Sequence, residues 1–268
     1  MIIEIRKLLQ KSSYSFNDLV TIMSVLRSPE GCPWDKKQTH KSIRRNLIEE
    51  TYEAVEAIDT DDDELLREEL GDILLQVVFH SEIADNKGSF NINDVCDGIC
   101  KKLIERHPHI FADVIASTSE QVLLNWDEIK KGEKGHKTHT DTINSIAKSL
   151  PSLMRSEKIQ KKAAKAGFDW PDVKGALLKT EEELSELKEA INEKDNLKIE
   201  EELGDLLFAV VNVSRFVGCD AEQALYNACE KFISRFEKVE NLAFKEGKSL
   251  NDMTLSEMDE LWERIKRI

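Results

Sequence analysis

The sequence has few of the residues that interrupt helices, with 5 prolines and 11 glycines among 268 residues. It contains no run of about 18 apolar residues, so no segment is expected to span a membrane. It also lacks the GxxxxGK[ST] phosphate loop, which excludes P-loop phosphoryl chemistry. Alternating apolar and polar runs bounded by turn residues are missing, whereas helical periodicity is frequent. We therefore predict an all-α fold.

Positive charge is scarce relative to negative charge. Lys and Arg number 38 against 52 Asp and Glu, and the formal net charge is −14. Nucleic acids and anionic membranes require a basic binding surface, so we predict neither as a partner. An anionic small molecule remains compatible with this balance if a bound metal reverses the sign locally.

Cysteines are few, and no two of them form a CxxC pair. Five are present, and Cys96 and Cys100 stand one helical turn apart. We interpret them as small, buried apolar residues rather than as metal ligands. The start of the chain shows no cleavable signal pattern. Together these features predict a reducing, cytoplasmic environment. The six histidines form no convincing site.

One acidic pattern occurs twice. Glu-Glu-x-x-Glu at 49–53 is followed by Glu-Leu-Gly-Asp at 69–72, and the same two motifs recur at 182–186 and 202–205. The spacing between the two motifs is the same in both copies. Carboxylates three residues apart project from one face of a helix. Two such helices packed antiparallel would bring four carboxylates together.

Clustered carboxylates repel one another unless a cation gathers them. Oxygen-only ligands suit Mg²⁺ or Mn²⁺. A single motif among 52 acidic residues would be typical of a solvated helix face, but its repetition predicts a metal site. A di-iron bundle is the nearest alternative, and it would require Glu-x-x-His on helices. The only such pair joins Glu133 to His136, in a glycine-containing polar segment.

Further motifs recur in the same order, which indicates an internal duplication. Gly-Cys-Pro-Trp at 31–34 corresponds to Gly-Phe-Asp-Trp at 167–170, and 100–106 resembles 229–235. A polar stretch without buried-type residues separates the copies. We predict three segments: an N-terminal domain at 1–129, a linker at 130–142 and a C-terminal domain at 143–268.

Apolar periodicity predicts helices around the motifs. One stripe ends at the turn residues 28–31 and consists of Leu19, Ile22, Met23 and Leu26. On the helix that carries the first Glu-Glu-x-x-Glu motif, we expect the buried side to consist of Ile48, Tyr52 and Val55. Residues 60–63 then provide N-cap chemistry for the next helix. Gly71 and Gly204 lie inside helices, where each costs roughly 1 kcal/mol relative to Ala. We expect close helix approach to account for them.

Basic and aromatic residues accompany each acidic motif. Those before the first motif are Lys36, Lys37, Lys41, Arg44 and Arg45, and those before the second are Lys158, Lys161, Lys162 and Lys165. Pairs four residues apart follow: Lys102 with Arg106, and Lys231 with Arg235. Surface solubility explains any single lysine, but the set suits a polyphosphate ligand beside a metal. Core anchoring and base stacking fit Trp34 and Trp170 equally well.

Together these motifs resemble the MazG family of nucleoside triphosphate pyrophosphohydrolases. The resemblance extends from 27–35 to 260–262 and includes Arg-His-Pro-His-Ile-Phe at 106–111. It implies tandem MazG-type helical domains whose four-helix-bundle-like core forms in a homodimer. It also implies hydrolysis of nucleoside triphosphates to nucleoside monophosphate and pyrophosphate. Mg²⁺ is the implied cofactor, and Mn²⁺ is expected to substitute for it.

The resemblance also implies site residues. The metal ligands would be Glu183, Glu186, Glu202 and Asp205 in the second copy, and Glu50, Glu53, Glu69 and Asp72 in the first. Glu49 and Glu182 adjoin them, as further metal contacts or to orient water. The implied catalytic residues are Glu182, Lys231 and Arg235. The implied substrate-binding residues are Lys158, Lys161, Lys162, Trp170, Lys231, Arg235 and Trp262.

Two alternatives remain open at this point. One is a relative of narrow specificity, such as a dUTPase-like or phosphoribosyl-ATP pyrophosphohydrolase. The other is a metal-stabilised helical interaction module without turnover. Between the two copies, the basic run at 158–165 and Trp262 favour the second as the main catalyst, whereas Pro33 and Pro108 occupy the corresponding segments of the first.

Overall fold

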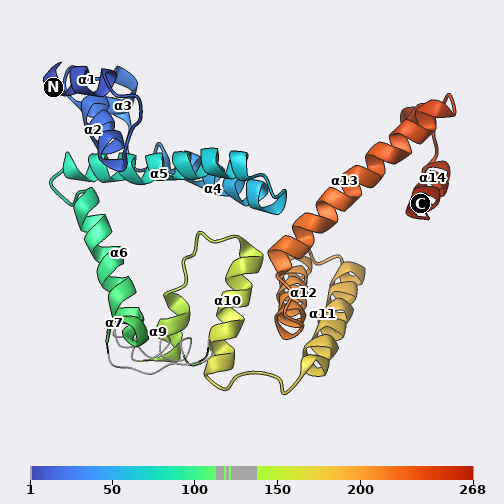
Figure 1. The fold of residues 1–268 in the computed structure, drawn as a ribbon. Coiled ribbons are helices and arrows are strands. Elements are labelled where there is room, and N and C mark those ends of the chain that lie inside the picture. The colour runs from blue at the N-terminus through green and yellow to red at the C-terminus, as the bar shows by residue number, and fades with distance from the viewer. Residues whose placement is uncertain (1, 113–117, 119–120, 122–137, 268) are drawn as a thin grey trace. The chain divides into compact units, whose positions relative to one another are not determined.

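The computed structural model of the protein describes residues 2–112, 118, 121 and 138–267 (Figure 1). These residues form helices and no strand, which confirms the predicted all-α class. The chain divides into two compact units, Met1–Glu133 and Lys134–Ile268. Of the predicted linker, 130–137 lie outside the described residues. In the last part of that segment, Thr138 caps a helix that begins at His139.

The first unit is built around a long helix, α5, against which α2, α4 and α6 pack. Its helices are α1 (Ile2–Leu9), α2 (Phe16–Arg27), α3 (Pro33–Lys37), α4 (Arg44–Asp59), α5 (Asp63–Asp85), α6 (Ile92–Arg106) and α7 (Pro108–Phe111). The turn between α4 and α5 is short, and Asp62 caps α5 by accepting hydrogen bonds from the backbone N–H groups of Glu64 and Leu65. The cap fixes where the second acidic helix of this unit begins.

The core of the first unit lies toward the C-terminal half of α5. Its buried members are Met23, Ile43, Val78, Phe79 and Ile83. Met23 comes from the predicted stripe on α2. The N-terminal half of α5, which carries the acidic motif, packs instead on α4. The acidic residues of this unit are therefore held between two helices at some distance from the main core.

Three residues of α4 that were expected to be buried are exposed within one chain. Ile48, Tyr52 and Val55 are 49%, 55% and 41% exposed, and the buried residues of α4 are Ala54 and Ala57. The reason is that α4 packs mainly on α5. The small residues of α4 are covered, whereas its larger apolar residues remain exposed.

The second unit contains a corresponding helical pair, α11 and α12. Its elements are α9 (His139–Asn144), α10 (Ser152–Lys165), α11 (Val173–Glu193), α12 (Asn196–Phe216), α13 (Ala221–Lys245), the 3₁₀ turn η1 (Leu250–Asp252) and α14 (Leu255–Lys266). Asp195 caps α12 as Asp62 caps α5. α10 packs on α12, and α14 packs on α13 around Val239, Ala243 and Leu261.

The expectations for two glycines and two cysteines are also wrong within one chain. A Cβ added at Gly71 or Gly204 would meet no atom within 4 Å, so no close helix approach requires these glycines. Cys96 and Cys100 are exposed rather than buried. These residues lie on helix faces that no other part of the described chain covers. Separately, none of the described helices is long and apolar enough to cross a membrane.

Candidate functional site

The two acidic motifs of the first unit meet between α4 and α5. They form the first acidic cluster, whose members are Glu50, Glu53, Glu69 and Asp72. Carboxylate oxygens of Glu50, Glu69 and Asp72 all lie within 4.8 Å of one another. The Glu53 carboxylate is close enough to Glu50 and Glu69 to contribute to raising the pKa of each. The structure thus gathers three of the four residues that the sequence singled out in this copy, and Glu53 lies next to them.

The first acidic cluster is strained electrostatically. Burial, followed by the charge of Asp72, raises the pKa of Glu50. Burial, followed by the charge of Glu53, raises the pKa of Glu69. One carboxylate oxygen of Glu69 is buried and has no hydrogen-bond partner among the described residues. Such an oxygen in a negative cluster fits a divalent cation, since cation binding would supply the missing partner.

The second unit repeats this arrangement with one difference. The second acidic cluster consists of Glu183 and Glu186 from α11 and Glu202 from α12, with carboxylate oxygens within 4.8 Å of one another. Its fourth predicted member, Asp205, is exposed on α12 and is not part of the group. A hydrogen bond with Glu183, followed by burial, raises the pKa of Glu186. This cluster therefore also offers oxygen ligands that repel one another.

Lys179 distinguishes the second cluster, and it was not predicted from the sequence. Its Nζ lies 2.7 Å from Glu183 Oε1 and 2.8 Å from Glu182 Oε1. These two hydrogen bonds raise the pKa of Lys179. Its spacing of three and four residues from the glutamates is the signal that could have revealed it. The first copy has Asn46 at the corresponding position.

The predicted basic residues are distributed over other helices. On α10 Lys161 pairs with Glu157 at 2.6 Å, while Lys158 lies one turn before Lys162. Lys231 and Arg235 lie on α13, and Trp262 of α14 packs against Phe232 with ring centroids 5.1 Å apart. Arg235 is among the groups that lower the pKa of Glu263 on α14, after Lys266. Within the described chain, the interactions found for the second acidic cluster come from α11 and α12.

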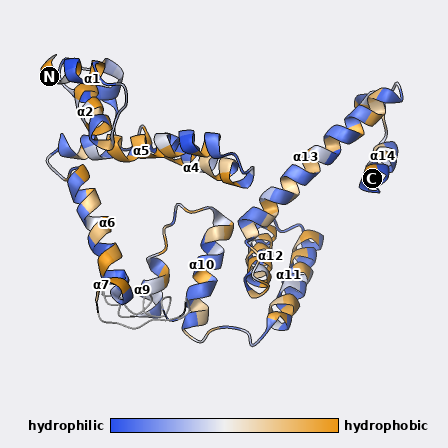
Figure 2. Ribbon diagram, viewed as in Figure 1, coloured by the Kyte–Doolittle hydropathy of each residue, from blue (hydrophilic) through white to orange (hydrophobic). Residues whose placement is uncertain are grey.

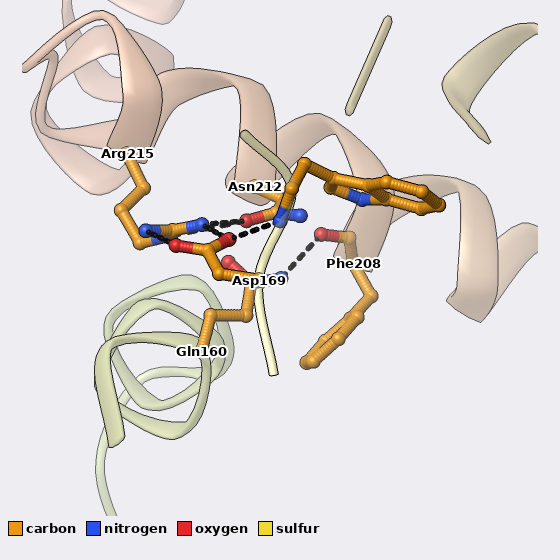
Figure 3. A network of polar contacts seen from close by, with 6 residues as sticks. Gln160, Asp169, Phe208, Asn212 and Arg215 are labelled. Atoms are coloured by element: carbon orange, nitrogen blue, oxygen red, sulfur yellow. Dashed lines mark hydrogen bonds and ion pairs between the residues drawn. The ribbon is translucent and has the colours of Figure 1, made fainter. Parts of the chain in front are cut away.

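Asp169 belongs to a polar network beside α12 (Figure 3), and its carboxylate accepts a hydrogen bond from the backbone N–H of Trp170 at 2.9 Å. A Cβ added at Gly175 would lie 2.8 Å from the Trp170 ring, so this glycine leaves space for the indole. The neighbouring Asp169 carboxylate accepts hydrogen bonds from the Arg215 guanidinium at 2.5 and 2.9 Å. Trp34 lies instead against Phe79, with centroids 6.4 Å apart. The two tryptophans therefore have different surroundings.

The sequence model of the MazG nucleotide pyrophosphohydrolase domain matches the chain twice, at residues 38–111 and 173–240. The chain belongs to the MazG family. Each matched segment contains one of the helical pairs that carry an acidic cluster, α4–α5 and α11–α12. The resemblance expected from the motifs and the tandem duplication are both confirmed.

Relatives of this chain are found in several bacteria. The chain is 48% identical to the nucleoside triphosphate pyrophosphohydrolase/pyrophosphatase MazG of Thermotoga maritima, over 96% of this chain and 98% of that protein. It is 46% identical to the nucleoside triphosphate pyrophosphohydrolase of Escherichia coli K12, over 93% and 96% of the two chains. An uncharacterized Bacillus subtilis protein, YabN, is 46% identical over 94% of this chain but only 52% of its own length. The MazG similarity thus spans nearly the whole chain.

Proposed function

We propose that this MazG protein is a Mg²⁺-dependent nucleoside triphosphate pyrophosphohydrolase. Water attack at the α-phosphorus would release nucleoside monophosphate and pyrophosphate. Membership of the family and the names of the Thermotoga maritima and Escherichia coli relatives support the hydrolysis of nucleoside triphosphates. The observation that carries the metal requirement is the gathering of repelling carboxylates around a buried, unpartnered oxygen of Glu69.

The carboxylates of each cluster would hold the metal on rigid helices. A divalent ion bound there would neutralise phosphate charge and acidify a water molecule. Glu182, whose Oε1 lies 2.8 Å from Lys179 Nζ, would orient that water and accept its proton. Lys231 and Arg235 would bind the charge of the leaving pyrophosphate. Asp205, one turn after Glu202, would complete the ligand set.

The products test this proposal. The purified protein is incubated with a panel of ribo- and deoxyribonucleoside triphosphates, with Mg²⁺, with Mn²⁺ and with EDTA, and products are identified by phosphorus NMR. We expect monophosphate and pyrophosphate as first products with either metal, and none with EDTA. Nucleoside diphosphate and orthophosphate as first products would contradict the proposed bond cleavage. Turnover of a single nucleotide would indicate the narrow-specificity alternative.

A further inference from the structure

Two histidines of the first unit meet ring to ring. His40 lies in the segment that precedes α4, and His80 lies on α5. Their Nδ1 atoms are 2.8 Å apart, and the two rings are inclined by only 5°. The ring centroids are 5.1 Å apart, as far as this Nδ1 separation allows, so the two Nδ1 atoms point directly at each other. A proton fits between them, whereas two metal–nitrogen bonds of about 2.0–2.1 Å would not.

The number of protons on the two rings decides whether this contact persists. When both rings are neutral, one Nδ1–H donates to the lone pair of the other Nδ1. One additional proton makes one ring an imidazolium, and the hydrogen bond becomes charge-assisted. A second additional proton places N–H groups on both facing nitrogens, and the two cations repel each other. The contact therefore tolerates one positive charge but not two.

The surroundings of His80 oppose its protonation. Its Nε2 atom is buried and has no hydrogen-bond partner among the described residues. An imidazolium would place a donor on that atom without an acceptor, which is unfavourable in a buried position. Burial, followed by the charge of His40, lowers the pKa of His80 below 6.5. The corresponding residue in the second copy is Val213, so this contact is a feature of the first unit.

Other charged groups on the helices packed against α5 are engaged elsewhere. Those with contacts of their own are Arg27 and Asp18 on α2, Arg45 and Glu49 on α4, and Asp94, Asp97 and Lys101 on α6. Those that are exposed around the start of α4 are Lys36, Lys37, Lys41 and Arg44. Within the described chain, His40 is the one charged group found to shift the pKa of His80. The two rings can therefore be treated as one coupled pair.

The pair lies where the chain enters α4. The backbone N–H of Ile43 donates to the Thr39 carbonyl, and that of Leu47 donates to the Ile43 carbonyl, both at 3.3 Å. Ile43 is 2% exposed and belongs to the core that includes Val78 of α5. Glu50 follows Leu47 by about one turn of α4. Whatever holds this segment on α5 thus also positions the α4 half of the first acidic cluster.

We propose that the His40–His80 pair is a pH-sensitive latch that holds the start of α4, and with it Glu50 and Glu53, on α5. His80 binds a proton less readily in the latched form than in the open form, so protons favour opening. The latch is closed above about pH 6.5 and weakens as the pH falls below that value. Protonation of the clustered glutamates acts in the opposite direction, because it relieves their repulsion.

Amide hydrogen exchange of the metal-free protein, corrected for the intrinsic rate, tests the latch between about pH 5 and about pH 7.5. The protection of Ile43 and Leu47 should fall severalfold as the pH is lowered over this range. His40→Ala removes the partner of His80, so its protection should already be low at the upper pH and should show no such step. The matched control is His139→Ala, at an exposed position on α9, which should behave as the wild type.

Nitrogen NMR of the histidine rings provides a readout that a merely structural role would not move. At about pH 7.5 the two Nδ1 atoms of the wild type should show scalar coupling across the hydrogen bond, and this coupling should disappear on acidification. If His40→Ala does not fold, this wild-type titration still decides. Absence of the coupling, or protection of Ile43 and Leu47 that stays constant over the pH range, would overturn the latch.

Discussion

Single residues make the two acidic clusters electrostatically unequal. Lys179 compensates Glu182 and Glu183, whereas the corresponding Asn46 carries no charge. The second cluster therefore carries a smaller excess of negative charge than the first cluster. A basic side chain at the edge of a metal cluster can also contact phosphate oxygens, so Lys179 favours the second unit as the main catalytic site.

The first prediction concerns which domain turns over substrate. Glu183→Gln removes a buried carboxylate of the second cluster and leaves Lys179 with only Glu182, so kcat should fall by at least roughly tenfold. The matched change Glu50→Gln in the first cluster should cost much less activity. Steady-state kinetics with saturating Mg²⁺ compares the two. A greater loss with Glu50→Gln would reverse the assignment.

The second prediction concerns pH. The pKa values of Glu50 and Glu69 are raised above 4.5, mainly by burial, so the folded protein retains protons that the unfolded chain releases. Stability of the metal-free protein should therefore fall as pH rises from 4.5 through the raised values. Thermal unfolding in EDTA measures this slope, and Glu69→Gln should reduce it. Glu56→Gln, exposed on α4, is the control. Equal slopes for all three proteins would contradict the buried Glu69 carboxyl as a source of the pH dependence.

At the scale of elements, the sequence predicted the helix caps and the acidic motifs. It did not predict which helix faces are covered by other parts of the protein. Residues 60–63 indicated the start of α5, and the structure places the cap at Asp62. The repeat indicated that α11 and α12 would match α4 and α5. Periodicity shows which residues share a helix face, but it does not show what covers that face. This is why Ile48 and its neighbours on α4 were wrongly expected to be buried.

Contacts between segments that are far apart in the sequence also could not be predicted from it. The Nδ1 atoms of His40 and His80 lie 2.8 Å apart and join the segment before α4 to α5, although the histidines formed no pattern along the chain. The Trp262 ring meets Phe232 because η1 returns the chain onto α13. Within the site, Lys179 was detectable from its spacing, whereas the Gln160 contact with α12 required the fold.

The third prediction concerns the helix cap of the first acidic pair. Asp62→Ala removes the acceptor of two backbone N–H groups at the start of α5 and should lower the free energy of unfolding by about 1 kcal/mol. Asp62→Asn keeps a good N-cap and should cost only a small part of that. Chemical denaturation of the metal-free proteins provides the comparison. An Asn variant as unstable as the Ala variant would show that the charge of Asp62, not its capping, stabilises α5.

At the scale of the whole molecule, large apolar side chains remain uncovered on both acidic helical pairs. Leu70 and Leu74 on α5 and Leu207 and Val210 on α12 are all exposed, and hydrophobic residues recur along these helices (Figure 2). Single exposed leucines are ordinary in soluble proteins, but rows of them along one helix mark an interaction surface. A second chain packed on these helices would also bury the apolar residues of α4 that are exposed in the single chain.

We therefore propose that the protein is a homodimer in which facing helical pairs form four-helix cores. Leu207→Glu places a charge on the 50%-exposed apolar row of α12 and should convert the dimer to monomer at micromolar concentration. Leu255→Glu, at an 80%-exposed position that begins α14, is the matched control and should leave the dimer intact. Light scattering coupled to size-exclusion chromatography measures both. A wild-type protein that is monomeric in this measurement would contradict the proposal, because the exposed rows would then have no partner.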